Sequence, residues 1–72
     1  MLFNVYNITP QVKYTYGCAL IAAHSEQEAI ETFCKDEYHK FIYEDYNCAC
    51  DIIPNMDYNS NNPCTIFNKI GG

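Results

Sequence analysis

The most regular pattern of hydrophobic and polar positions lies in the middle of the chain, just after Ser25. The apolar side chains there recur at helical spacing and form one stripe: Ala29, Ile30, Phe33 and Cys34, continuing to Tyr38 or Phe41. Ser25 followed three residues later by Glu28 is a capping box, and Glu26 adds another acid to the first turn, where the helix dipole favours negative charge. The sequence therefore predicts a helix that begins after Ser25 and covers a core with one face.

Two strand-like segments, residues 2 to 8 and residues 12 to 23, precede this helix. Both are rich in β-branched and aromatic residues, and Thr9-Pro10-Gln11 separates them, so we predict a hairpin. A period of two along the second segment predicts one set of side chains on the core face: Tyr14, Tyr16, Cys18, Leu20 and Ala22.

Two more strands are predicted after the helix. Residues 46 to 53 alternate cleanly, and one set of side chains points one way: Tyr46, Cys48, Cys50 and Ile52. Residues 54 to 63 are rich in Asn and Pro and predict a polar loop, which leads into a strand over residues 64 to 70. Residues 39 to 45 suit either a helix end or a connector. The order ββαββ predicts an α+β fold, in which one amphipathic helix packs on a small, mainly antiparallel sheet.

Length and charge restrict the function. With 72 residues the chain has room for a single domain, residues 1 to 72. Nine acidic residues stand against four lysines and no arginine, so the formal net charge is -5. Binding to a phosphate backbone depends on several cations and favours guanidinium groups, so we expect no direct binding of nucleic acid. An acidic surface suits a basic protein partner, or serves solubility alone.

The N-terminus and the cysteines indicate the compartment. Residues 1 to 8 carry no basic leader and no small-residue cleavage site, and no apolar run approaches the roughly 20 residues that span a membrane. Five cysteines, an odd number at irregular spacing, are typical of free thiols in a reducing environment. We therefore predict a cytoplasmic protein that does not insert in a membrane.

The cysteines and histidines are the first candidates for metal binding or catalysis. Cys48 and Cys50 would need further donors to complete a metal site, and the chain offers Cys18, Cys34, Cys64, His24 and His39. A C-x-C pair on a strand points both thiols into one packed face, however, where free cysteine behaves as a small hydrophobe. No cysteine lies in basic surroundings that would activate it as a nucleophile. We expect core packing, with no metal, no cofactor and no catalytic residue, and hence no enzyme.

The loop predicted after Pro54 contains part of a calcium-binding pattern. Asp57, Asn59 and Asn61 occupy its positions 1, 3 and 5, but Asn62 stands where glycine is needed and Asn68 where a glutamate should follow. We therefore expect a turn-rich loop rather than an ion site.

Tyrosines and acidic residues supply the candidate contact surface. Three tyrosines are predicted to lie on the sheet face under the helix (Tyr14, Tyr16 and Tyr46), and three are surface candidates (Tyr38, Tyr43 and Tyr58). The adjacent pairs Asp36-Glu37 and Glu44-Asp45 are typical of a solvated surface rather than of a catalytic pair. The predicted interaction surface comprises Glu31, Asp36, Tyr38 and Tyr43.

The last strand runs directly into Gly71-Gly72. Together with the order ββαββ and the length, this resembles the β-grasp plan of ubiquitin-like modifiers and bacterial sulfur-carrier proteins. The resemblance implies a carrier that is activated at the carboxylate of its terminal glycine, with Gly71 and Gly72 as a thin tail. The chain lacks the basic residues that flank the tail of ubiquitin.

A second resemblance lies in "ALIAAHSEQEAIETF", residues 19 to 33. This strand, serine cap and apolar helix resemble a segment of short proteins from bacterial mobile elements, including the DpnD/PcfM-like family. The reading that follows is a small cytosolic interaction module without enzymatic activity, an accessory protein of a phage or mobile element that binds an unidentified protein. The alternatives are the glycine-tailed carrier and an acidic inhibitor that imitates nucleic acid.

Overall fold

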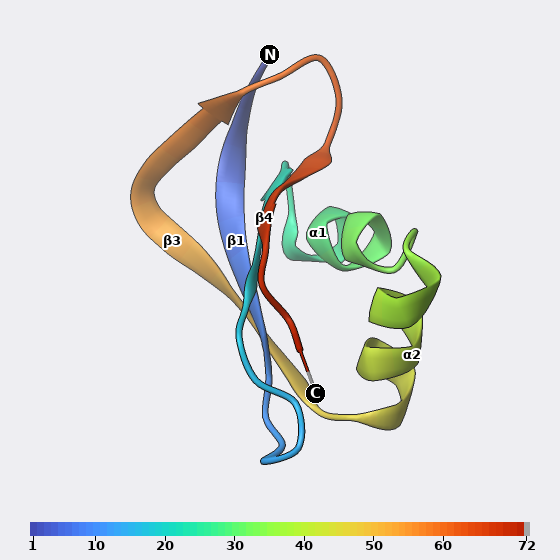
Figure 1. Ribbon diagram of the computed structural model, residues 1–72. Coiled ribbons are helices and arrows are strands. Elements are labelled where there is room, and N and C mark those ends of the chain that lie inside the picture. Colours follow the sequence, from blue (N-terminus) through green and yellow to red (C-terminus); the bar gives the residue numbers. More distant parts are fainter. Residues whose placement is uncertain (72) are drawn as a thin grey trace.

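Two helices pack on one face of a four-stranded antiparallel sheet in the computed structural model, which describes residues 1 to 71 (Figure 1). The elements follow in the order β1 (Leu2–Pro10), β2 (Ala19–Ala23), α1 (Glu26–Phe33), α2 (Glu37–Asp45), β3 (Cys48–Asn59) and β4 (Cys64–Asn68). The predicted α+β class is confirmed. The predicted order ββαββ is wrong, because residues 37 to 45 form a second helix and the order is ββααββ.

The second helix begins at Asp36, whose side chain makes a new N-cap. Its Oδ1 accepts hydrogen bonds from the backbone N–H groups of Tyr38, at 2.9 Å, and His39, at 3.1 Å. These bonds satisfy donors that a helix start would otherwise leave without partners. The apolar stripe of α1 therefore ends at Phe33 and Cys34, and it does not continue to Tyr38, which is exposed.

His39 ties the second helix to the first. Its ring is buried and lies flat against Phe33, with 4.3 Å between ring centroids and 2° between ring planes. Nδ1 of His39 is 3.2 Å from the carbonyl oxygen of Phe33. Because a carbonyl oxygen can only accept, Nδ1 carries the proton and donates it to the last turn of α1. This contact makes His39 a core residue that joins the two helices.

The sheet has the strand order β3-β1-β2-β4. The predicted antiparallel pairing is confirmed, since β1 and β2 pair in a register that runs from Asn4 opposite Ala23 to Ile8 opposite Ala19. The predicted turn at residues 9 to 11 is wrong, because β1 continues to Pro10, the chain reverses between Val12 and Thr15, and β2 begins only at Ala19. The consecutive strands β3 and β4 lie on opposite edges, and residues 60 to 63 connect them past the N-terminal end of β1 (Figure 1). The middle of the sheet is thus the hairpin.

The core lies between the sheet and α1. Its fully buried members include Ile8, Ala19, Ile21, Ala23, Ala29 and Phe33. On β2 the side chains that face α1 are therefore Ala19, Ile21 and Ala23 rather than those of the predicted set. Of that set Ala22 is fully buried, but on the opposite face of the sheet, and Cys18 and Leu20 are half-buried. The segment "ALIAA" is apolar at every position, so a period of two cannot distinguish its faces. Small side chains at Ala19 and Ala23 let the helix pack closely.

The tyrosines predicted for the core lie elsewhere. Tyr14 is 72% exposed and Tyr16 is 69% exposed, because both belong to the tip of the hairpin beyond β2. Tyr46 is half-buried and lies edge-on to Phe41, as the residue that ends α2. Tyr58 is exposed, as expected.

The loop predicted over residues 54 to 63 is wrong in its first half, because β3 continues to Asn59. Asn4 pairs with Asp57 and Tyr6 with Ile52, so residues 53 to 56 face only Val5. Figure 1 shows β3 bowing away from β1 there, on the side opposite the helices. Pro54 has no N–H to donate, and Asn55 has a φ of 60°, a value that asparagine tolerates better than most residues. Both residues suit this interruption of the pairing.

Candidate interaction surface

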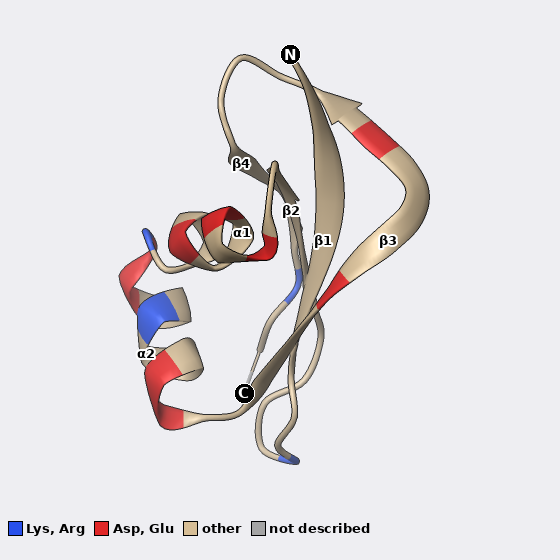
Figure 2. Cartoon of the chain, turned by 180° about the vertical axis from the view of Figure 1, so that it is seen from behind, with Lys and Arg blue, Asp and Glu red and all other residues tan. Residues whose placement is uncertain are grey.

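The charges of the chain are divided unevenly between the helices and the rest of the molecule. We define the helix layer as residues 26 to 45. It contains two lysines, Lys35 and Lys40, and seven acidic residues: Glu26, Glu28, Glu31, Asp36, Glu37, Glu44 and Asp45. Outside it, Asp51 and Asp57 balance Lys13 and Lys69. The whole formal net charge of -5 therefore lies on the helix layer, and Figure 2 shows most of the acidic residues on or next to α1 and α2, with the others on β3.

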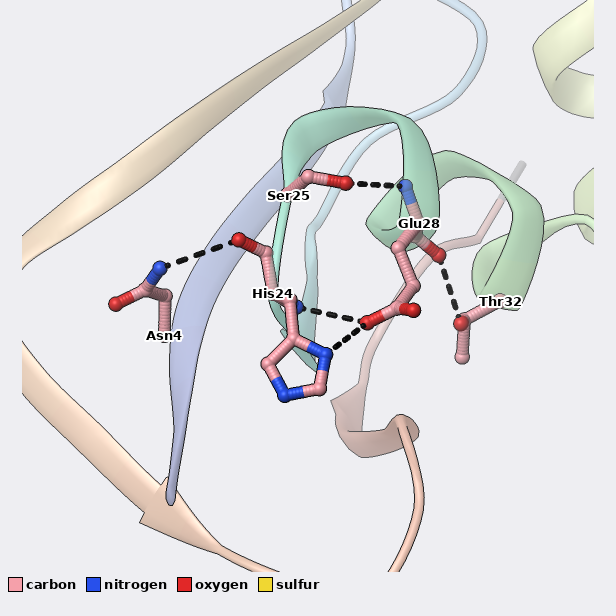
Figure 3. A network of polar contacts seen from close by, with 5 residues as sticks. All are labelled: Asn4, His24, Ser25, Glu28 and Thr32. Carbon is pink, nitrogen blue, oxygen red and sulfur yellow. Dashed lines mark hydrogen bonds and ion pairs between the residues drawn. The ribbon is translucent and has the colours of Figure 1, made fainter. Parts of the chain in front are cut away.

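One of these carboxylates is engaged in holding the start of α1 (Figure 3). The N–H of Glu28 donates to Ser25 Oγ at 3.1 Å, as the capping box predicts. The carboxylate of Glu28 accepts from the N–H of His24 at 2.8 Å, one residue before the expected donor. It also lies 3.1 Å from Nδ1 of His24. Glu28 is therefore a structural residue, like Asp36, which caps α2.

The other two carboxylates of α1 belong to Glu26 and Glu31. Among residues 1 to 71, the hydrogen bonds and ion pairs of side chains involve neither Glu26 nor Glu31. Both side chains are exposed. They remain free to meet a partner.

Glu26 and Glu31 border a shallow hollow between the two helices, with a volume of about 360 Å³. We call it the α1–α2 hollow, and it is lined by Glu26, Gln27, Ile30, Glu31 and Tyr43. Four of these residues lie at positions i, i+1, i+4 and i+5 of α1, which cover an arc of about 140° around the helix, with Glu26 and Glu31 at its two edges. Tyr43, half-buried and packed against the core, closes the hollow from α2. The hollow thus has an apolar floor and an anionic rim.

The structure brings together two of the four residues predicted for the interaction surface. Glu31 and Tyr43 line the α1–α2 hollow, whereas Asp36 borders a different depression next to β4. Tyr38 is 47% exposed and lies outside both. Sequence reasoning missed Glu26, Gln27 and Ile30, although their helical spacing from Glu31 would have identified them.

Three cysteines pack against the core, as predicted: Cys34, Cys48 and Cys50. Burial raises the pKa of all three thiols, and for Cys50 burial together with the charges of Glu26 and Asp51 raises the pKa to about 11. Such a thiol stays protonated near neutral pH and is a poor nucleophile. Within residues 1 to 71 there is no group of three or more His, Cys, Asp or Glu side chains placed to hold a metal ion.

The residues of the partial calcium pattern do not share a loop. Asp57 and Asn59 belong to β3, where they pair with Asn4 and Leu2 of β1. Oδ1 of Asn59 accepts a hydrogen bond of 2.9 Å from the amino group of Met1. Asn61 lies beyond the strand, in the segment that leads to β4.

Gly71 continues the pairing of the C-terminal segment with the hairpin. Its N–H donates to the carbonyl oxygen of Tyr16 and its carbonyl oxygen accepts from the N–H of Tyr16, both at 2.9 Å. Gly72 lies outside the described residues. The predicted tail is therefore joined to the fold as far as Gly71.

No protein-family model, curated protein or solved structure matches the chain. The two family resemblances stay predictions, and function is inferred from geometry and charge. In the described part of the chain, neither helix has the length and apolar character needed to cross a membrane.

Proposed function

We propose that this domain is a cytosolic protein-interaction module without enzymatic activity, and that its helix layer binds a basic protein. The observation that carries the proposal is the division of charge: the helix layer holds the entire net charge of -5, and the rest of the molecule is neutral. A face of one sign attracts a partner of the opposite sign and orients it during encounter. Capping and the helix dipole account for the acidic residues at the starts of α1 and α2, but not for Glu31, Glu44 and Asp45.

The local chemistry of the helix layer leaves Glu26 and Glu31 available for binding, although Glu26 also stands in the first turn of α1, where the helix dipole favours an acid. Their carboxylates cap no helix and pair with no lysine within residues 1 to 71. Glu28 and Asp36, in contrast, serve the fold through their hydrogen bonds to backbone N–H groups. The resemblance of residues 19 to 33 to mobile-element proteins adds the proposal that the module is an accessory protein of a phage or mobile element.

The test compares two double variants that change the net charge equally. In Glu26→Lys/Glu31→Lys the change falls on the helix layer, and in Asp51→Lys/Asp57→Lys it falls on β3, where both side chains are exposed. Tagged forms of both variants and of the wild type capture proteins from the native host, and mass spectrometry quantifies each one. We expect partners that the β3 variant retains and the helix variant loses. Equal retention by both variants would contradict the proposal.

The same experiment separates the two alternative functions. Release of a captured partner by duplex DNA would support the acidic inhibitor that imitates nucleic acid. Covalent adducts that form with the wild type, but not with a form lacking Gly71 and Gly72, would support the carrier. That function would require Gly71 to leave Tyr16, which it meets through two hydrogen bonds.

A further inference from the structure

The α1–α2 hollow differs from the neighbouring depression in its balance of charge. The neighbouring depression carries two carboxylates, Glu37 and Glu44, together with two lysines, Lys35 and Lys40. The α1–α2 hollow carries two carboxylates and no cation. Acidity alone would not distinguish these places, whereas the absence of a cation from the lining of the α1–α2 hollow does. A visiting cation would find unpaired carboxylates there.

The remaining lining residues restrict the kind of cation. Ile30 offers an apolar floor for an aliphatic stem, and Tyr43 offers an aromatic ring that packing against the core holds in place. Arginine combines a flexible stem with a planar cation that stacks on aromatic rings and pairs with carboxylates through two parallel hydrogen bonds. Lysine carries a compact and strongly hydrated point charge, so it stacks less well on an aromatic ring and cannot form two parallel hydrogen bonds with a carboxylate.

The size of the hollow suits one side chain of a partner. Its volume of about 360 Å³ is near the lower end of the range of small-molecule sites, about 300 to 1,000 Å³. Because Glu26 and Glu31 stand on successive turns of the same helix, the rim extends along α1 and a partner chain can follow it. The hollow is therefore a binding site for a single side chain within a larger acidic face.

We propose that the α1–α2 hollow binds one arginine side chain of a basic protein partner, with Glu26 and Glu31 pairing with the guanidinium and Tyr43 stacking on it. This inference rests on the proposed function and identifies the residues of the helix layer that would bind a side chain of the partner. These 72 residues contain no arginine, so a second copy of this domain cannot supply the occupant, which comes from a segment of different sequence.

The test uses hexa-arginine and hexalysine peptides as probes, with affinities from fluorescence anisotropy and positions from amide shifts in NMR spectra. We expect the wild type to bind hexa-arginine more tightly than hexalysine, with saturable shifts centred on residues 26 to 31 and on Tyr43. Glu26→Gln/Glu31→Gln should weaken hexa-arginine binding at least fivefold. The matched control Glu37→Gln/Glu44→Gln removes the same charge from the neighbouring depression and should change the affinity less than twofold.

Tyr43→Leu tests the stacking contact. It should weaken hexa-arginine binding about two- to fivefold, the size expected for an exposed cation–π contact, and change hexalysine binding less. Because Tyr43 also packs against the core, dispersion of the NMR spectrum checks its fold, and the glutamine pair decides the matter if this variant unfolds. Equal losses in the two glutamine pairs would overturn the arginine site and leave the acidic face as a partner surface. If the wild type binds neither peptide at low salt, the site and the proposed function both fail.

Discussion

Gly17 lies directly against the backbone of Lys69, so closely that a Cβ atom on Gly17 would stand 1.6 Å from the carbonyl oxygen of Lys69. Gly17 also has a φ of 97°, in the region that residues with a side chain rarely adopt. The close approach lets the N–H of Lys69 donate to the carbonyl oxygen of Cys18 at 2.9 Å. It thereby extends the pairing between the C-terminal segment and the hairpin.

Gly17→Ala should therefore destabilise the domain. We expect a loss of about 2 kcal/mol or more in the free energy of unfolding, measured by urea denaturation, because the backbone strain and the overlap with Lys69 add. Gly71→Ala is the matched control, since its Cβ would meet the ring of Tyr16 at 3.6 Å, an ordinary contact. Equal stability of the two variants would contradict the close approach of Gly17 to Lys69.

The N-cap of α2 gives a second prediction. Asp36→Ala removes the acceptor for two backbone N–H groups and should lower the free energy of unfolding by about 1 kcal/mol. Asp36→Asn keeps a capping oxygen and removes only the charge, so its stability should stay close to that of the wild type. If Asp36 contributes to partner binding through its charge, Asp36→Asn lowers partner capture without loss of stability. Thermal denaturation and partner capture distinguish the two roles.

His39 provides a third prediction. His39→Phe keeps a ring stacked on Phe33 but loses the hydrogen bond to the carbonyl oxygen of Phe33. We therefore expect the free energy of unfolding to fall by about 1 kcal/mol. His39→Ala loses the buried ring as well and should cost about 2 to 4 kcal/mol. Urea denaturation measures both. A harmless His39→Ala would show that the contact between the helices does not stabilise the fold.

The thiol of Cys50 predicts a pH dependence. Its pKa in the folded protein is raised from 9.0 to about 11, first by burial and then by the charges of Glu26 and Asp51. Between these values the unfolded chain loses the proton that the folded chain keeps, so ionisation stabilises the unfolded state. The contribution of Cys50 is complete below pH 9.0 and is lost as the pH rises toward about 11. The free energy of unfolding should thus fall less steeply over this window in Cys50→Ala than in the wild type, and equal slopes would contradict the raised pKa.

The sequence predicted those parts of the fold that depend on local chemistry. The capping box at Ser25 and Glu28 defines the start of α1, and the structure begins α1 at Glu26. The pairing of the first two strands was also predicted from local residue types, but the turn between them was placed too early, at residues 9 to 11 instead of between Val12 and Thr15. The second helix was missed because an aspartate such as Asp36 is common both at the start of a helix and in a turn. The packing of His39 on Phe33 favours the helix, and this contact is not visible in the local sequence.

Local patterns failed to predict the structure where contacts between segments distant in the sequence determine it. Pro54 and Asn55 indicate a turn, yet pairing with β1 resumes at Asp57 and holds the chain as a strand. The candidate surface shows the same limit. Glu31 and Tyr43 were predicted to share one interaction surface, but their meeting in one hollow depends on the second helix, which the sequence did not reveal.

The strand order also determines how the chain can fold as it leaves the ribosome. The hairpin of β1 and β2 is the one pairing between neighbouring strands in the chain within residues 1 to 71, and each outer strand joins it only after a long stretch of intervening sequence. Non-local pairings of this kind slow folding. The outer edge of β2, which is apolar at all five positions, stays open until residues 64 to 68 emerge to cover it. During synthesis this edge is the place where a nascent chain would pair wrongly with another, and β4 is the strand that ends the exposure.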